Sequence, residues 1–212
     1  ARWRRLSSKC DRSGSRLSEL AEQKSILRGH MSEIRAESAA RDPDAAEHLA
    51  ARFPMKLFER YGPVVSAYVA RGDELDPAPL LERLRGAGAT IALPRVEEDG
   101  AMTFRAAEDA PLETGAFDVQ QPGADAEVVR PSLVLAPLLA FDPRGNRLGY
   151  GKGHYDRAIA ALRESGRVFY LGLSYAQQQA DVVPADKHDI PLDWVETPVH
   201  SVPLFLGRAM AR

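Results

Sequence analysis

One segment limits the possible folds of this 212-residue chain more than any other, because an unbroken apolar run leads directly into a glycine-rich sequence. Residues 133–142 read LVLAPLLAFD, which is typical of a strand buried on both faces of a parallel sheet. The glycine-rich segment occupies 141–157, FDPRGNRLGYGKGHYDR, and a helical pattern follows over 156–165. A buried strand, a tight turn and a helix in this order indicate an α/β protein, in which ligands bind at the carboxyl ends of the strands.

The rest of the chain shows the same alternation of strands and helices. Apolar periodicity, with glycine and proline as breaks, predicts helices over 17–37, 43–60, 77–86 and 156–165. Strands are expected at 64–70, 90–96, 102–106, 133–142, 168–175 and 194–200, and the polar stretch 107–131 is expected to be a long loop. We therefore expect a sheet with right-handed crossovers.

The charge of the chain is unevenly distributed. The formal net charge is −2 at pH 7, but residues 1–16 carry six basic residues and one acidic residue, a charge of +5, which leaves −7 for the remainder. We expect residues 1–20 to be a flexible basic tail, while their Arg-rich, Ser-rich composition also fits a targeting segment or an upstream start site. Residues 21–212 are expected to form one domain.

Composition excludes several classes of protein. A near-neutral total charge argues against a dedicated nucleic-acid or anionic-membrane binder. The single cysteine, Cys10, cannot form an internal disulfide, and no apolar run reaches about 18 residues, the length of a membrane-spanning helix. Composition thus indicates a cytoplasmic globular protein, with no nucleic acid and no membrane as partner. We also expect a monomer that acts on small molecules.

The glycine-rich segment is the strongest candidate for a ligand site. Gly149, Gly151 and Gly153 alternate, so backbone N–H groups can approach an anion without a Cβ in the way. Arg147 and Lys152 add positive charge, and the helix that follows presents its positive N-terminus. The segment matches neither G-x-x-x-x-G-K-[ST] nor G-x-G-x-x-G. The residues alone leave two alternatives, a phosphate-binding loop or a simple glycine-rich turn.

Two further groups of charged residues have a functional and a structural interpretation. Lys24, Arg28 and Arg35 form one stripe on the first helix, which would suit a bound anion or simply face solvent. Glu74 follows the first strand and could accept hydrogen bonds from an amino-heterocycle or cap the next helix.

Acidic residues near the phosphate loop raise the question of a metal. Asp156 and Asp189 come from different loops, and two carboxylates beside phosphates would suit Mg²⁺. Helix capping by Asp156 and loop hydrogen bonding by Asp189 are the structural alternatives. His188 is expected to be structural.

Four segments in order resemble the 5-formyltetrahydrofolate cyclo-ligase family: KSILR at 24–28, AYVARGDELD at 67–76, LAFDPRGNRLGYGKGHYDR at 139–157 and HDIPLD at 188–193. The third is the most specific, and the resemblance extends from Lys24 nearly to the end of the chain. It implies a three-layer α/β fold with a mostly parallel sheet flanked by helices, like that of sugar-phosphate isomerases and CoA transferases. It also implies closure of 5-formyltetrahydrofolate to 5,10-methenyltetrahydrofolate with Mg²⁺ and ATP, through a phosphorylated formyl group.

The resemblance assigns roles residue by residue. Lys152 is implied as the catalytic residue, and Asp156 and Asp189 as the magnesium ligands. Two departures are His154, where the family more often has Tyr, and Ser132, where it often has Asp. ATP-binding positions are implied at Lys24, Arg28, Arg147, Gly149, Gly151, Lys152, Gly153 and Tyr155, and folate-binding positions at Val69, Glu74, Tyr150 and His154.

Three other functions compete with this interpretation. A sugar-phosphate isomerase of the same fold would need no ATP and would leave the basic helix and the glycine loop unexplained. A non-catalytic folate or nucleotide binder would be favoured by the loss of Lys152, Asp156 or Asp189, yet all three are present. An RNA-associated module would depend on residues 1–16.

Overall fold

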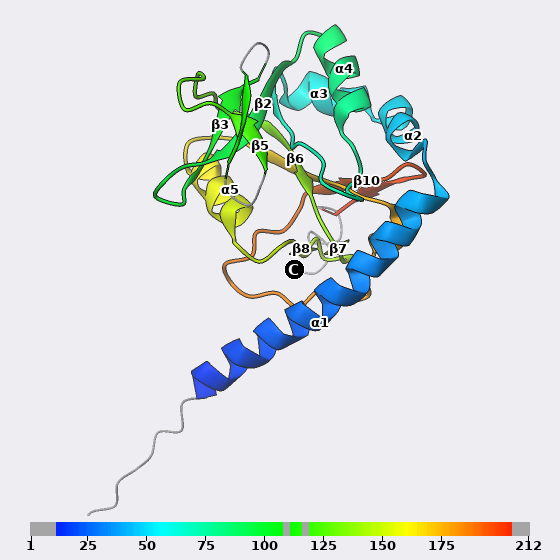
Figure 1. The fold of residues 1–212 in the computed structure, drawn as a ribbon, viewed down its shortest axis with the longest axis vertical. Helices are drawn as coiled ribbons and strands as arrows, with labels where there is room; N and C mark the ends of the chain where they lie inside the picture. The colour runs from blue at the N-terminus through cyan, green and yellow to red at the C-terminus, as the bar shows by residue number, and fades with distance from the viewer. Residues whose placement is uncertain (1–11, 108–110, 116–118, 205–212) are drawn as a thin grey trace, which may run out of the picture.

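The centre of the structure, a computed structural model, is a seven-stranded sheet (Figure 1). The structure describes residues 12–107, 111–115 and 119–204. The strand order is β11-β10-β9-β6-β1-β2-β3. The inner strands pair in parallel, whereas β3 and β11 pair antiparallel at the two edges. The strands are β1 (Val64–Ser66), β2 (Thr90–Val96), β3 (Met102–Ala106), β6 (Leu133–Pro137), β9 (Phe169–Leu173), β10 (Trp194–Glu196) and β11 (Ser201–Pro203).

Helices cover both faces of this sheet. Leu133 and Leu135 of β6 pack with residues of α2 and α4, whereas Val134 and Ala136 pack with residues of α5. Because neighbouring residues of a strand point to opposite faces, this division shows two cores with the sheet between them. The predicted three-layer α/β architecture is confirmed. The helices are α1 (Arg12–Arg41), α2 (Ala45–Arg52), α3 (Met55–Tyr61), α4 (Ala78–Gly86), α5 (His154–Glu164) and the short 3₁₀ helix η2 (Ala176–Gln178).

The predicted helix over 43–60 is wrong as a single element, because proline divides it. Helix α2 ends at Arg52, and Phe53 takes an extended conformation (φ −49°, ψ 126°) before Pro54. A residue before proline is driven away from the helical region, and proline has no N–H to continue the hydrogen bonds. Helix α3 then starts at Met55.

The predicted loop over 107–131 contains a small hairpin. Strands β4 (Leu112–Thr114) and β5 (Gln120–Pro122) pair antiparallel. The three residues of β4 are all exposed, so no alternation of apolar and polar residues marks it as a strand.

The apolar run 133–142 forms two strands instead of one. Strand β6 ends at Pro137, and β7 (Ala140–Phe141) pairs antiparallel with β8 (Arg147–Leu148). The turn between β7 and β8 includes Gly145 at φ +89°, a conformation that favours glycine. The predicted strands 64–70 and 194–200 are likewise shorter, ending at Ser66 and Glu196, because the backbone leaves the sheet there to form loops.

Helix α1 lies against the body of the protein through its C-terminal half. Met31 is buried with Leu139, Ala140 and Leu148, and Figure 1 shows α1 passing beside β7 and β8 while its N-terminal half extends beyond the body. The helix begins at Arg12, so it includes residues 12–20 that the sequence assigns to the tail; residues 1–11 lie outside the described residues. Within the described chain, no helix combines the length and the apolar character that crossing a bilayer requires.

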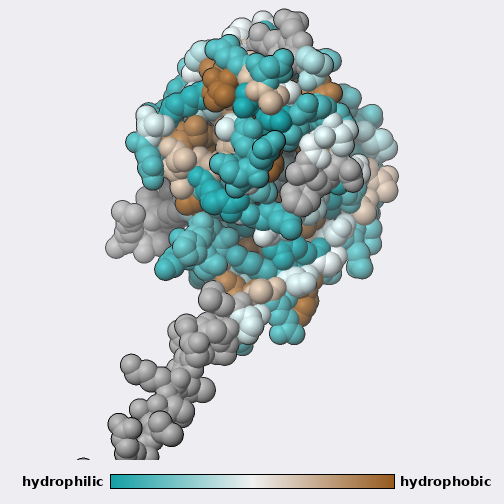
Figure 2. Space-filling model, turned by 60° about the vertical axis from the view of Figure 1, so that its left-hand side comes forward, coloured by the Kyte–Doolittle hydropathy of each residue, from teal (hydrophilic) through white to brown (hydrophobic). Residues whose placement is uncertain are grey.

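Large apolar side chains are concentrated in the two cores on either side of the sheet. On the face of the molecule drawn in Figure 2, hydrophobic residues form small, separate patches among hydrophilic ones. Val65, Ile91, Leu135 and Leu171, all on central strands, are fully buried. The surface in this view therefore offers no broad apolar area.

The strand order places a switch in direction between β1 and β6. From β1 the chain continues to β2 and β3 on one side, and it later forms β6, β9 and β10 on the other. In open α/β sheets, ligands bind in the crevice beyond the carboxyl ends of the strands at such a point.

Candidate functional site

A cavity of about 920 Å³ lies at this switch point. Tyr68 and Val69, which follow β1, and Pro137, the last residue of β6, form its floor together with Pro94 and Val96 of β2. Helix α1 and the loop between β8 and α5 supply two further walls. Every site residue predicted from the sequence lines this cavity, namely Lys24, Arg28, Val69, Glu74, Arg147, Gly149, Tyr150, Gly151, Lys152, Gly153, His154, Tyr155, Asp156 and Asp189.

The glycine loop packs directly against α1. Gly151 has φ +87°, and a Cβ at this position would lie 2.7 Å from Nη2 of Arg28. The Nε–H of Arg28 also donates to the carbonyl oxygen of Gly149 over 2.8 Å. Gly153, at φ +66°, precedes the first residue of α5. Glycine at 151 therefore meets two requirements, a left-handed backbone and close approach to an arginine.

Arg147 lies buried against two tyrosine rings that stack on each other. Its Cζ is 5.3 Å from the ring centroid of Tyr155 and 5.6 Å from that of Tyr170, and Nη2 is 3.3 Å from Oδ2 of Asp156. Burial raises the pKa of both phenols far above the usual value, so both stay protonated. Nε of Arg147 and the hydroxyl of Tyr155 are buried without a hydrogen-bond partner among the described residues. Buried polar groups of this kind favour a polar ligand or ordered water nearby.

Asp156 and Asp189 lie close together because the backbone beside Asp189 is hydrogen-bonded to Asp156. Oδ1 of Asp156 accepts a hydrogen bond from the backbone N–H of Ile190, the residue after Asp189. Oδ2 of Asp189 is 2.7 Å from Nζ of Lys24 and also accepts the N–H of Asp186. Among the described residues there is no group of three or more His, Cys, Asp or Glu that could hold a metal. A divalent ion would have to take most of its ligands from phosphate and water, as Mg²⁺ commonly does.

Glu74 is a buried carboxylate that lines the same cavity. The carboxylate accepts hydrogen bonds from the hydroxyl of Tyr150 (3.0 Å) and the N–H of Arg71 (2.9 Å), and it is 9% exposed. Burial raises the pKa of Glu74, while these two hydrogen bonds and the charge of Arg35 oppose that shift. A buried carboxylate in this setting can receive two N–H donors from a heterocycle.

His154 lies at the start of α5, on the cavity wall. Burial and the positive charge of Arg157 lower its pKa. The imidazole is therefore neutral at pH 7, and the pH-sensitive binding expected from protonation of this residue would occur only in more acidic solution.

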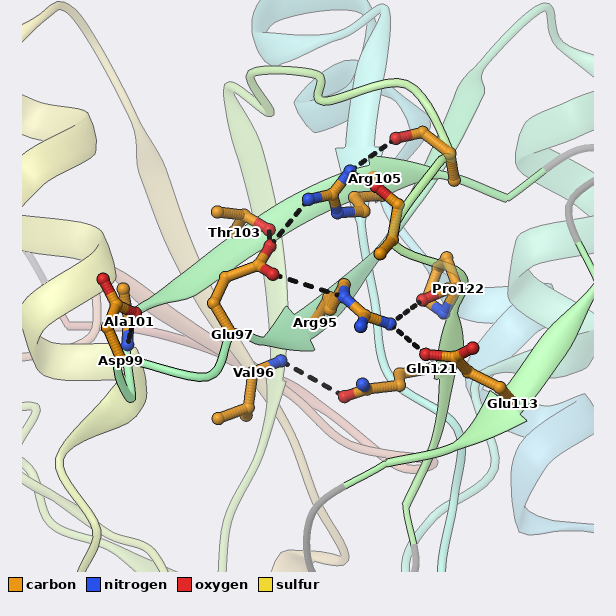
Figure 3. A network of polar contacts seen from close by, with 12 residues as sticks. Arg95, Val96, Glu97, Asp99, Ala101, Thr103, Arg105, Glu113, Gln121 and Pro122 are labelled. Atoms are coloured by element: carbon orange, nitrogen blue, oxygen red, sulfur yellow. Dashed lines mark hydrogen bonds and ion pairs between the residues drawn. The ribbon is translucent and has the colours of Figure 1, made fainter.

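The sequence missed one wall of the cavity, which the β4–β5 hairpin supplies through Val119, Gln120 and Gln121. Figure 3 shows how polar contacts fix this hairpin to the sheet. Arg95 of β2 pairs with Glu113 of β4 and donates to the carbonyl of Pro122. Nothing in the order of these residues indicates that they meet, because the contacts depend on the tertiary arrangement.

Comparisons with known proteins agree with this geometry. The sequence model of the 5-formyltetrahydrofolate cyclo-ligase family matches residues 20–198. Curated relatives with the name 5-formyltetrahydrofolate cyclo-ligase include one from Haemophilus influenzae, 27% identical over 174 residues, with 78% of this chain and 92% of the relative covered. Another, from Mycolicibacterium smegmatis, is 30% identical over 150 residues, with coverage of 66% and 76%.

Solved structures show the same fold. The NMR structure of a 5,10-methenyltetrahydrofolate synthetase from Aquifex aeolicus superposes with a TM-score of 0.69 at 28% identity, covering 85% of this chain and 92% of that chain. A 5,10-methenyltetrahydrofolate synthetase from Mycoplasma pneumoniae gives a TM-score of 0.65 at 21% identity, with coverage of 82% and 98%.

Proposed function

Since the chain belongs to the 5-formyltetrahydrofolate cyclo-ligase family, we propose that it closes 5-formyltetrahydrofolate to 5,10-methenyltetrahydrofolate, with conversion of ATP to ADP and phosphate. Family membership makes it a ligase. One observation carries the proposal: a single cavity is lined both by a cationic glycine loop and by a buried carboxylate. A triphosphate has chemistry that suits the loop, and an amino-heterocycle has chemistry that suits the carboxylate.

ATP phosphates would bind between α1 and the glycine loop. Arg28 contacts the glycine loop from the helix, Lys24 lines the cavity from the same helix beside Asp189, and Arg147 and Lys152 belong to the loop side of the cavity. The N-terminus of α5 adds the positive end of a helix dipole. Nε of Arg147 and the hydroxyl of Tyr155, which have no hydrogen-bond partner in the part of the chain that the structure describes, could meet phosphate oxygens or the water around them.

Magnesium fits the acidic side of the same region. Asp156 and Asp189 would hold the ion through carboxylate oxygens, with phosphate and water as the remaining ligands. When bound, the ion would neutralise charge on the phosphates. Both carboxylates already pair with a cation, Arg147 and Lys24 respectively, so these residues would share the acids with the ion.

The reaction would need positioning and charge stabilisation more than covalent chemistry by the protein. The formyl oxygen attacks the γ-phosphorus, the bond from that phosphorus to the bridging oxygen breaks, and ADP leaves. N10 then attacks the activated formyl carbon, the carbon–oxygen bond breaks, phosphate leaves and the N10 proton is released. Lys152 lies in the loop, where its ammonium group would stabilise charge on the transferred phosphoryl group.

The folate ring would bind beside Glu74. Glu74 would accept hydrogen bonds from the pterin, with Val69, Tyr150 and His154 as neighbouring contacts on the cavity wall.

The prediction of a cytoplasmic monomer rests on the sequence alone and stays a prediction.

The direct test is to mix the protein with 5-formyltetrahydrofolate and Mg-ATP and to follow the near-ultraviolet absorbance of the methenyl product. We expect product only when ATP and a divalent cation are both present, with one ADP released for each product molecule. A reaction that runs equally well without ATP, or no product at high enzyme concentration, would reject the proposal.

A further inference from the structure

Arg35 is a buried arginine that the predicted site does not include. It lies on α1 two helical turns after Arg28, and its side chain is 6% exposed. Nη1 donates to the hydroxyl of Tyr150 over 3.1 Å and is 3.7 Å from Oε1 of Glu74. Nη2 is 2.6 Å from Oδ1 of Asp73. A guanidinium removed from water in this way must be held by its partners, so its placement is costly to maintain.

These contacts form a chain that ends in the cavity. Arg35 donates to the hydroxyl of Tyr150, and that hydroxyl donates onward to Oε1 of Glu74 over 3.0 Å. Tyr150 is 54% exposed and lines the cavity, so only its polar end is held. The Cζ of Arg35 is also 5.9 Å from the centroid of the Tyr150 ring. Arg35 thus orients both the ring and the carboxylate.

We propose that Arg35 is a positioning residue, which fixes the Glu74 carboxylate and the Tyr150 ring for the heterocycle of the folate substrate. The proposal rests on the proposed function, because it takes Glu74 as a contact of the pterin. Arg35 itself does not line the cavity and would act through these two residues.

The charges around Glu74 explain why an arginine is needed. Burial raises the pKa of Glu74, and the groups that oppose this shift are the N–H and charge of Arg71, the Tyr150 hydroxyl and the charge of Arg35. The other titratable groups near it, Asp73, Asp76, Tyr68 and Tyr155, provide no positive charge. Without Arg35 the carboxylate would take up a proton at higher pH, and a protonated Glu74 cannot accept two hydrogen bonds from the pterin.

A purely structural role for Arg35 can be separated from this one. The ion pair with Asp73 ties α1 to the turn after β1, and Asp73→Asn removes that pair while leaving Arg35 beside Glu74. If Arg35 served only to attach the helix, Asp73→Asn and Arg35→Met would have the same effect on substrate binding.

The test compares these variants by the pH dependence of KM for 5-formyltetrahydrofolate and by folate binding without ATP. We expect Arg35→Met to raise KM about tenfold near pH 7 with kcat changed much less, and to move the loss of binding on acidification to higher pH. Arg35→Lys should partly restore the profile, and Asp73→Asn and the exposed-helix control Arg41→Met should keep the wild-type profile.

Each outcome decides between the alternatives. A wild-type pH profile in Arg35→Met, or the same shifted profile in Asp73→Asn, would overturn the proposal. If Arg35→Met does not fold by circular dichroism, Tyr150→Phe interrupts the same chain and must shift the profile in the same direction. Wild-type protein without ATP-dependent turnover would instead reject the proposed function.

Discussion

At the scale of single residues, Lys152 is the side chain whose charge should matter most for turnover. It is exposed on the loop that lines the cavity, between two glycines. We expect Lys152→Ala to lower kcat by about a hundredfold or more and to weaken folate binding only slightly, because its charge acts as the phosphoryl group moves. Single-turnover kinetics and folate titration measure the two effects.

Lys56→Ala is the matched control for Lys152→Ala. Lys56 is exposed on α3, away from the cavity lining, so its loss should leave both quantities unchanged. An equal loss of folate affinity and kcat in Lys152→Ala would contradict a role in phosphoryl transfer.

Gly151 and Gly88 allow backbone strain to be separated from steric exclusion. Gly151→Ala would combine φ +87° with a contact to Arg28, whereas Gly88→Ala has φ +90° and open space around the new Cβ. We expect both variants to lose about 1–2 kcal/mol of unfolding free energy, and only Gly151→Ala to raise KM for ATP. Urea unfolding and steady-state kinetics test this, and an unchanged KM for ATP in Gly151→Ala would show that the loop tolerates the displacement of Arg28.

The sequence identified the glycine loop and its cations because they lie within one short segment. It placed Arg35 on a stripe with Lys24 and Arg28, but it could not show that the side chain reaches Tyr150 and Asp73. Those partners lie far away in the chain, so their contacts follow from tertiary packing.

At the scale of elements, the β4–β5 hairpin should depend on Arg95. Arg95 forms ion pairs with Glu97 of the loop after β2 and with Glu113 of β4 (Figure 3). Glu97 also accepts hydrogen bonds from the side chains of Thr103 and Arg105 on β3. We expect Arg95→Met to speed amide hydrogen exchange in β4 and β5 and to raise KM for folate about threefold to tenfold, since the hairpin carries one wall of the cavity.

Arg85→Met, on the exposed side of α4, is the control for this prediction and should change neither quantity. Faster exchange without a change in KM would show that the hairpin wall does not contact the substrate.

Elements with strong periodicity were predictable, and short ones were not. Strands β2 and β3 and helix α4 match their predicted positions to within one residue. The hairpin was missed because strands of three residues carry too little pattern, and the break at Pro54 was missed because the apolar positions continue across it.

At the scale of the whole molecule, a buried carboxylate outside the cavity should shape stability against pH. Glu196 of β10 is fully buried and accepts hydrogen bonds from Trp194 and Ser201, both over 2.9 Å. Burial raises its pKa from the ordinary 4.5, despite these bonds and the charges of Arg52 and His200. The folded state thus holds this proton more tightly than the unfolded chain does.

The contribution of Glu196 to stability is therefore complete below about pH 4.5 and is lost as pH rises through the folded-state pKa. We expect Glu196→Gln to remove this loss of stability with rising pH. The unfolding free energy of the variant, relative to that of the wild type, should therefore increase with pH. Urea unfolding between about pH 4 and 8 measures the difference. The exposed control Glu59→Gln should run parallel to wild type, and a parallel curve for Glu196→Gln would contradict the prediction.

The position of the cavity within the molecule was only partly predictable. The sequence indicated that ligands bind at carboxyl ends of strands, but it could not give the strand order that puts β1 next to β6. That order depends on how separate α/β units pack, which no local pattern contains.

Helix α1 also sets the spacing of its own contacts to the cavity walls. Lys24 contacts Asp189, Arg28 contacts the glycine loop, and Arg35 contacts Tyr150 and Glu74, so the contacts extend over eleven residues, a rise of about 16 Å along the helix. A single inserted or deleted residue between Lys24 and Arg35 would turn one of these side chains by about 100° relative to the other. Substitutions here can alter affinity, whereas a change of length would separate recognition of the phosphates from recognition of the ring.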